Sequence, residues 1–169
     1  MKKLFAVGII LLAICISISA VSADDGFSFN FSSSDSSNSN GGSVEVNNNN
    51  VKIQDIQYTI PDGFKENQSA QIVGEDAEQD SFPGFKISSV RFDKGDDSII
   101  IKVLFGDDKL DDNTYTPGND TVAKKVGDVD GYLAEFTDGI SFNYIKDGKL
   151  IEIFAPDEKT LTSVLSSSQ

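Results

Sequence analysis

The sequence predicts an α+β domain: a mainly antiparallel sheet of five to seven strands with a C-terminal helix packed on one face. Three apolar runs near the end of the chain are separated by tight-turn residues, which indicates consecutive hairpins. An apolar stripe at helical spacing follows the last run. Further apolar runs upstream supply the additional strands that a three-stranded meander needs for stability.

The meander comprises residues 131–136, 140–145 and 150–154, with turns at Thr137-Asp138-Gly139 and Asp147-Gly148. We expect a three-residue first loop, with Gly139 left-handed in a bulge, and a two-residue second loop, because this register gathers the large apolar residues on one face. That face would carry Tyr132, Ala134, Phe136, Ile140, Phe142, Tyr144, Ile151 and Ile153.

The opposite face of the meander mixes polar and apolar residues. Its polar members are Glu135, Ser141, Asn143 and Glu152. We expect this face to contact a partner through its apolar members, which are Leu133, Ile145, Leu150 and Phe154.

The sequence after the meander predicts a C-terminal helix, both from the residues at its start and from the apolar stripe along it. Pro156 suits the first helical position, and the acidic residues Asp157 and Glu158 complement the positive end of the helix dipole. A stripe at i, i+3 and i+4 should pack on the sheet; it consists of Leu161, Val164 and Leu165.

The upstream strands differ in their apolar patterns, and the patterns predict different degrees of burial. Residues 56–60 alternate and end at Pro61-Asp62-Gly63, while residues 85–92 alternate more loosely. Residues 98–105 are nearly all β-branched or aromatic, which predicts a central strand buried on both faces. Residues 121–126 read as an edge strand. Two polar segments remain: 65–84, a loop or weak helix, and 106–120, an exposed loop.

Residues 1–23 have the order of a secretory signal peptide. Lys2 and Lys3 precede an apolar run over 4–18, and small residues follow, with Val21 and Ala23 at the positions a signal peptidase reads. We expect a secreted or cell-surface protein. The run is also about long enough to span a bilayer, so an uncleaved membrane anchor is one alternative. Lipidation at Cys15 is another, although Ile14 is bulkier than the small residue such a site needs.

Residues 24–50 are rich in Ser, Asn and Gly and predict a disordered linker, which places the folded domain at 51–169. Phe27, Phe29 and Phe31 alternate at strand spacing, so a short strand is the alternative within this segment.

The net charge argues against nucleic-acid and lipid partners, and the lack of His argues against several catalytic and zinc sites. The chain has a formal charge of −13, with no His and with Cys15 as its single Cys. Without residues 1–23, 12 basic and 27 acidic residues leave −15. Such a surface repels nucleic acid and anionic lipid, so membrane contact is expected only through an uncleaved N-terminal segment. His-dependent nucleophiles and the usual zinc ligand sets are absent, which favours a non-enzymatic protein.

A resemblance to known proteins rests on two short motifs. Tyr58-Thr-Ile-Pro-Asp-Gly-Phe64 is similar to the opening strand and turn of PsbP-like α/β sandwiches. Val129-Asp130-Gly131-Tyr132, followed by a meander and a short helix, resembles the ending of small exported proteins of archaea and Gram-positive bacteria that have no assigned function. The resemblance covers residues 51–169 and implies a fold and a non-enzymatic tendency.

Acidic clusters raise the possibility of a calcium site, with Asp107, Asp108, Asp111 and Asp112 as candidate ligands. The helix-loop-helix calcium pattern fails, because Lys109 occupies position 3 counted from Asp107 and Tyr115 occupies position 5 counted from Asp111. A solvated loop is the expectation, and a calcium-stabilised structural module of the envelope is the alternative.

A hydrolase of unrecognised type is the second alternative. Glu135 and Glu152 share a face in the expected register, but the central strand separates them, so a catalytic carboxylate pair is not expected. A Ser-Lys dyad stays open, without a Ser-x-x-Lys motif. Glycosylation sequons begin at Asn30, Asn67 and Asn119.

Together these observations predict an exported or cell-surface, non-enzymatic binding domain. Its partner would be an unknown protein or small ligand outside the cell. No catalytic or cofactor-binding residue is predicted, and contact is expected at loop 106–120 and at the mixed face of the meander.

Overall fold

A computed structural model describes residues 41–77 and 82–168 of this protein. The signal peptide, most of the linker and the alternating Phe27, Phe29 and Phe31 lie outside the described residues, so those predictions stand untested. In the two described ranges, no helix is long and apolar enough to cross a membrane.

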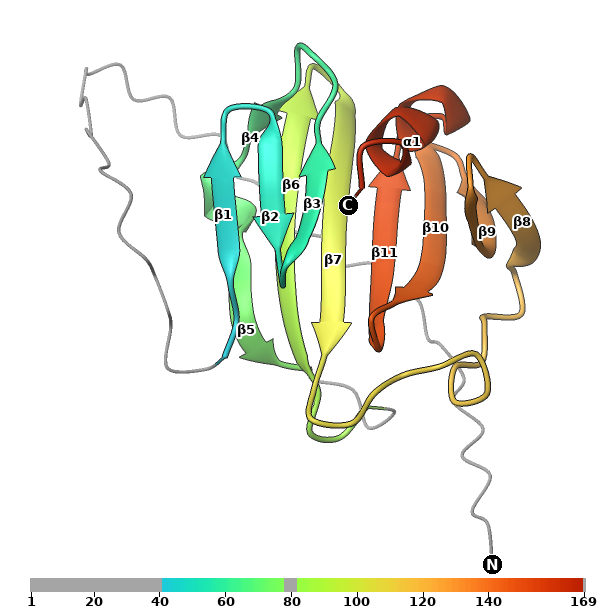
Figure 1. Ribbon diagram of the computed structural model, residues 1–169. Coiled ribbons are helices and arrows are strands. Elements are labelled where there is room, and N and C mark those ends of the chain that lie inside the picture. The colour runs from blue at the N-terminus through green and yellow to red at the C-terminus, as the bar shows by residue number, and fades with distance from the viewer. Residues whose placement is uncertain (1–40, 78–81, 169) are drawn as a thin grey trace, which may run out of the picture.

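The main layer is an antiparallel sheet of eight strands, drawn from green to orange in Figure 1. The strand order is β4-β6-β7-β11-β10-β9-β8, and β5 also pairs with β6. The strands are β4 (Lys65–Glu66), β5 (Ile72–Asp76), β6 (Lys86–Lys94), β7 (Asp97–Phe105), β8 (Val122–Val126), β9 (Val129–Phe136), β10 (Gly139–Lys146) and β11 (Lys149–Ala155).

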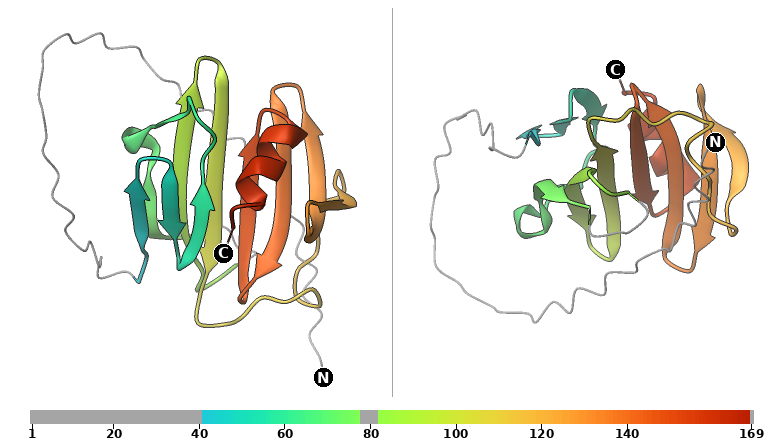
Figure 2. Two further views of the ribbon diagram at one scale, coloured as in Figure 1. Left: turned by 45° about the horizontal axis from the view of Figure 1, so that its top comes forward. Right: turned by 90° about the horizontal axis from the view of Figure 1, so that it is seen from below.

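A second layer covers one face of this sheet, which we call the inner face. It consists of a three-stranded sheet, β1 (Val44–Asn47), β2 (Asn50–Ile53) and β3 (Ile56–Thr59), and the helix α1 (Glu158–Leu165). Figures 1 and 2 show β1–β3 lying over β6 and β7, with α1 beside them over β10 and β11. A short 3₁₀ helix, η1 (Gln68–Ala70), follows β4.

The main core lies between the two layers. Alternate residues of the long strands point inward, where they meet the apolar residues of β1–β3 and the stripe of α1. The largest fully buried side chains are Tyr58, Phe92, Phe142, Ile53, Ile56, Ile60, Ile99, Ile101, Ile151, Ile153, Leu161 and Val51. Tyr58 of β3 and Tyr144 of β10 join the layers through a 2.9 Å hydrogen bond between their hydroxyls.

The outer face of the main sheet has a smaller apolar cluster at one end. Leu104 of β7 and Leu150 of β11 are buried there beneath Leu110 and Tyr115 of the 106–120 loop and beneath Phe82. In Figure 1 this loop runs in yellow below the sheet from β7 to β8. The loop was expected to be exposed; most of it is, but Leu110 and Tyr115 hold it against the sheet.

The expected register of the first meander turn is wrong. The turn is a two-residue loop, Thr137-Asp138, and Gly139 pairs with Phe136 as the first residue of β10. A Cβ at Gly139 would lie 2.5 Å from the Ala155 carbonyl oxygen and 2.6 Å from the Phe154 ring, so this glycine is needed inside the sheet and is not free to form the turn. Leu133 therefore pairs with Phe142 and faces the main core.

The second meander turn is confirmed. Lys146 pairs with Lys149 across Asp147-Gly148, and both turn residues have the positive φ of a type I′ turn, 53° and 77°. The central strand at 98–105 is confirmed as β7, between β6 and β11, and the edge strand at 121–126 is confirmed as β8.

The mainly antiparallel sheet with a C-terminal helix on one face is confirmed, but the described residues are mainly β with a single helix, and a second sheet, β1–β3, was not predicted. The main sheet has eight strands instead of five to seven, because residues 65–84 contribute β4 and β5. Residues 44–47, assigned to the linker by their polar surroundings, form β1, whose valines pack on the main core. The helix begins at Glu158, and Asp157 caps it by accepting a 2.7 Å hydrogen bond from Thr160 N–H.

The paired hydroxyls of Tyr58 and Tyr144 generate the first prediction. Tyr58→Phe and Tyr144→Phe should each cost roughly 1–3 kcal/mol of unfolding free energy, because each leaves one buried hydroxyl without a partner. The double variant should cost less than the sum, since it removes both polar groups together. Urea unfolding of the four proteins measures the coupling, and strictly additive changes would contradict the buried pair.

Candidate binding site between β9 and β10

Strands β9 and β10 pair along only part of their length. Their ladder runs from Phe136–Gly139 to Tyr132–Asn143 and stops there. Strand β10 continues to Lys146, still paired with β11, and β9 begins three residues earlier at Val129, where it pairs only with β8. The main sheet is therefore split at this end.

Gly131 lies where β9 leaves β10. A Cβ at this position would be 2.5 Å from the Asn143 carbonyl oxygen and 2.5 Å from the Phe142 ring. The strand backbone rests directly on the buried ring, and any larger residue would have to displace backbone or core atoms. Close packing of Gly131 against Phe142 thus sets the position of the split.

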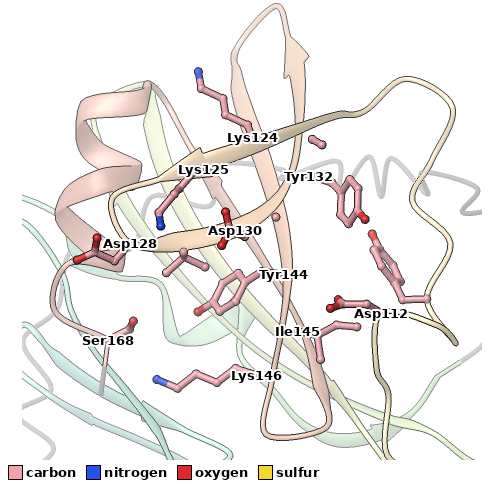
Figure 3. A pocket seen from close by; sticks show the side chains of 14 residues that line it. Asp112, Lys124, Lys125, Asp128, Asp130, Tyr132, Tyr144, Ile145, Lys146 and Ser168 are labelled. Carbon is pink, nitrogen blue, oxygen red and sulfur yellow. The ribbon is translucent and has the colours of Figure 1, made fainter.

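A pocket of about 840 Å³ opens at the split, and we call it the split pocket (Figure 3). Its volume is in the range usual for ligand sites. Consecutive residues of each strand line it, although their side chains point to opposite faces of the sheet, which is expected only when a pocket opens between strands. The lining consists of Asp112, Tyr115, Ala123, Lys124, Lys125, Asp128, Val129, Asp130, Gly131, Tyr132, Tyr144, Ile145, Lys146 and Ser168.

Three of the four tyrosines of the chain, Tyr115, Tyr132 and Tyr144, line this pocket, and Tyr58 contacts Tyr144 from β3. Tyr115 and Tyr132 face each other with ring centroids 5.8 Å apart. Tyr144 lines the pocket and is held by Tyr58 behind it. Burial raises the pKa of Tyr144 to about 12, opposed by its hydrogen bond with Tyr58. Burial, with the Tyr144 phenol beside it, raises the pKa of Tyr58 well above its usual range. These phenols are neutral at physiological pH.

Opposite charges balance around the pocket. Three lysines, Lys124, Lys125 and Lys146, and three aspartates, Asp112, Asp128 and Asp130, contribute to the lining, in a chain whose net charge is −13. Lys124 forms a 2.7 Å ion pair with Glu158 at the start of α1, which ties the β8–β9 hairpin to the second layer. The pocket is thus locally neutral on an acidic protein.

Tyr115 contains an unsatisfied buried hydroxyl. Its side chain is 5 % exposed, and the hydroxyl oxygen has no hydrogen-bond partner among the described residues. Burial, and secondarily the charges of Glu152 and Tyr132, raise the pKa of this phenol well above its usual range. A buried hydroxyl without a partner lowers stability, and such local costs concentrate at functional sites.

A row of polar residues crosses the outer face and leads to the pocket. Cross-strand pairs connect them in the order Ser89, Lys102, Glu152, Asn143 and Tyr132, and Ala123 of the edge strand β8 follows. Glu152 accepts hydrogen bonds from Lys102 Nζ at 2.9 Å and from the Ser141 hydroxyl at 3.1 Å. Because Glu152 holds the Lys102 ammonium, this row gives no support to a Ser-Lys dyad with Lys102 as base.

The predicted placement of Glu135 and Glu152 on one face is wrong. Glu135 pairs with Ile140 on the inner side of the sheet, whereas Glu152 lies on the outer face. The two carboxylates cannot act together on one substrate.

Three of the four residues of the predicted contact face, Ile145, Leu150 and Phe154, lie on the outer face of the main sheet, where Ile145 pairs with Leu150; Leu133 does not. Leu133 is in the main core, and Leu150 is buried beneath the 106–120 loop. Ile145 and Phe154 are half-buried on the outer face, and only Ile145 lines the split pocket. The sequence analysis did not single out Tyr132 and Tyr144 as site residues, although the Val129-Asp-Gly-Tyr132 motif marks the strand that forms one wall.

The candidate calcium ligands Asp107, Asp108, Asp111 and Asp112 are exposed in the 106–120 loop. Asp111 accepts backbone hydrogen bonds from Asn113 and Thr114 at 2.9 Å, and hydrogen bonding, chiefly from Thr114, holds its pKa below the usual value. Within residues 41–77 and 82–168, no group of three or more potential ligands is placed to hold a metal ion. The calcium-stabilised alternative remains a prediction.

The two sequons within the described ranges differ in their surroundings. The Asn67 side chain is half-buried and donates a 2.8 Å hydrogen bond to Asp93, whereas Asn119 is exposed in its loop. Asn30 lies outside the described residues.

Comparisons with protein-family models, with curated proteins and with solved structures found no match to this chain. The resemblance to PsbP-like sandwiches therefore remains a prediction.

The contact between Gly131 and Phe142 can be tested by adding one methyl group. Gly131→Ala should lower the unfolding free energy by roughly 1–3 kcal/mol, because the new Cβ overlaps a carbonyl oxygen and a core ring. Chemical unfolding measures the change. A variant as stable as the parent would show that β9 can shift away from the ring, and the split would then not be fixed by this contact.

Removal of the unpaired hydroxyl of Tyr115 should raise the unfolding free energy, whereas Gly131→Ala should lower it. Tyr115→Phe should raise the unfolding free energy by about 1 kcal/mol, because it removes a buried polar atom and keeps the ring. Thermal unfolding measures the shift, with Tyr132→Phe as the control for loss of a phenol on the neighbouring ring. Destabilisation by Tyr115→Phe would mean that the hydroxyl has a partner.

Proposed function

We propose that this protein is a non-enzymatic binding domain of an exported chain and that the split pocket receives its ligand. The observation that carries the proposal is the opening of the main sheet between β9 and β10, which leaves a pocket lined by tyrosines and by balanced charges. The export part of the proposal rests on the composition of residues 1–23.

The composition of the lining supports reversible binding. Aromatic rings offer large contact area at low conformational cost, and phenols, amines and carboxylates offer directional polar contacts. Neutrality of the site allows an anionic, cationic or zwitterionic ligand to approach, whereas the rest of the surface repels anions.

The arrangement of potentially catalytic groups favours binding over catalysis. The carboxylate Glu152 is engaged by Lys102 and Ser141, and Glu135 lies on the other side of the sheet. Burial raises the pKa of Tyr144 to about 12 and the pKa of Tyr115 well above its usual range, so neither of these two phenols is poised to transfer protons near neutral pH.

Filling the pocket tests the proposal. Ala123 is exposed on β8 and lines the pocket opposite Tyr132, so Ala123→Trp should place an indole in the pocket at little cost in stability. We expect binding to fall by at least tenfold. Binding is measured on arrays of glycans and of linear peptides, with the purified full-length chain.

The matched control is Val122→Trp on the same strand. Val122 is 60 % exposed, points to the opposite face and does not line the pocket, so this variant should bind like the parent. Equal binding by Ala123→Trp and the parent, or no ligand on either array, would overturn the proposal.

A further inference from the structure

Backbone hydrogen-bonding groups of β10 point into the split. Lys146 and Lys149 close a two-residue turn, and such a closing pair exchanges hydrogen bonds. Alternation then directs the backbone groups of Tyr144 toward β11 and those of Ile145 toward β9. The β9–β10 ladder ends at Asn143, so the N–H and C=O of Ile145 have no opposite residue in β9.

The facing strand presents an equivalent pair of groups. Val126 and Val129 close the turn of the β8–β9 hairpin, so Val129 and Gly131 bond to β8 and Asp130 directs its N–H and C=O toward β10. In a continuous sheet Asp130 and Ile145 would pair with each other. Here the pocket lies between them, and both residues line it.

We propose that the split pocket binds an extended polypeptide segment, which pairs its backbone with the free edge of β10 at Ile145. This inference rests on the proposed binding function and adds the chemical class of the ligand. An extended peptide is the ligand whose own N–H and C=O groups repeat at the spacing that a strand edge offers.

The lining also supplies contacts for alternating side chains. Side chains of an added strand point to the two faces of the sheet in turn. On the outer side they would meet Ile145, Tyr132 and Tyr115, and on the inner side they would meet the ring of Tyr144 beside Gly131. Lysines and aspartates at the rim offer ion pairs to a segment of either charge.

The geometry favours a peptide over a sugar. A carbohydrate would use the tyrosine rings and the rim charges, but it would leave unexplained why two residues on facing strands both direct unpaired backbone groups into one pocket. Three residues of β10, Tyr144–Lys146, line the pocket, which corresponds to roughly 10 Å of strand edge. The paired part of the ligand is therefore short, about three residues.

The experiment uses peptides selected by the full-length chain from a displayed library of linear sequences about ten residues long. The strongest binder is resynthesised with N-methyl groups at alternate residues, in two versions that block one edge of the peptide or the other. We expect one version to lose binding by at least tenfold. Equal binding of both versions and the parent peptide would mean that backbone pairing is not used, and the inference would be overturned.

The protein side of the same contact is tested with Ile145→Pro. Proline removes the N–H that points into the split and takes no hydrogen bond from the β10–β11 ladder. Ile145→Ala is the matched control, since it removes the side chain and keeps the N–H. We expect Ile145→Pro to weaken peptide binding roughly tenfold, and Ile145→Ala by about threefold at most.

Hydrogen exchange gives a readout that does not depend on a variant. In the complex, the amide protons of Ile145 or Asp130 should exchange more slowly, because each gains an acceptor from the peptide. Unchanged exchange at both amides with bound peptide would overturn strand addition.

The outcomes separate this inference from the proposed function. If glycans bind, Ala123→Trp blocks them, and no peptide is selected, the pocket is a binding site and the polypeptide inference fails. If nothing binds and Ala123→Trp changes nothing, the proposed function itself fails.

Discussion

A sheet whose central strands are apolar on both faces must be covered on both faces. Strand β7 has this character: Ile99, Ile101 and Val103 point to one side, while Ile100 and Leu104 point to the other. Most of the inner face is covered, by β1–β3 over β6 and β7 and by α1 over β10 and β11, but it is open at the edge strand β8, where Val122 is 60 % exposed. Among the described residues, the outer face is covered at one end, by the 106–120 loop and by Phe82. The surfaces available for binding are those that this division leaves open.

The tyrosine pair Tyr58–Tyr144 connects the covering layer to the edge of the split. Tyr144 belongs both to the main core and to the pocket wall, and its hydroxyl is held by a residue of β3. Lys124 plays a similar role on the opposite wall, where it is paired with Glu158 of α1. Both walls of the pocket therefore contact the second layer, one through a buried pair of hydroxyls and the other through a partly exposed ion pair.

The pocket and the acidic surface have complementary roles. A strongly negative surface keeps the domain soluble and discourages association with nucleic acid and anionic membranes. Lysines and aspartates line the pocket in equal number, so this repulsion is weaker there. Free backbone groups of two strands lie at the same place, which gives the site a directional component that an apolar patch would lack. Exposed strand edges are a risk for aggregation, and here the free edge is short and recessed between β8–β9 and the 106–120 loop.

The sequence by itself determined the mainly antiparallel sheet with its C-terminal helix, the central strand β7, the edge strand β8, the Asp147-Gly148 turn and the buried stripe of α1. Each of these follows from local periodicity or from a turn that admits few residue types. It could not determine the first turn of the meander, because both registers bury many apolar residues. Gly139 decides between the two registers, because it must lie inside the sheet under the ring of Phe154 in the next strand.

The position and lining of the split pocket could be predicted from the sequence less well than the strands and the helix, because they depend on tertiary contacts. The motif Val129-Asp-Gly-Tyr132 was visible in the sequence, but the need for glycine at position 131 arises from the ring of Phe142 and the carbonyl of Asn143. Tyr115, Tyr132 and Tyr144 line one pocket only because two strands and a loop converge, and Tyr58 reaches Tyr144 from β3. Local sequence specifies which strands form, whereas the point at which two strands separate is decided by contacts between residues that are distant along the chain.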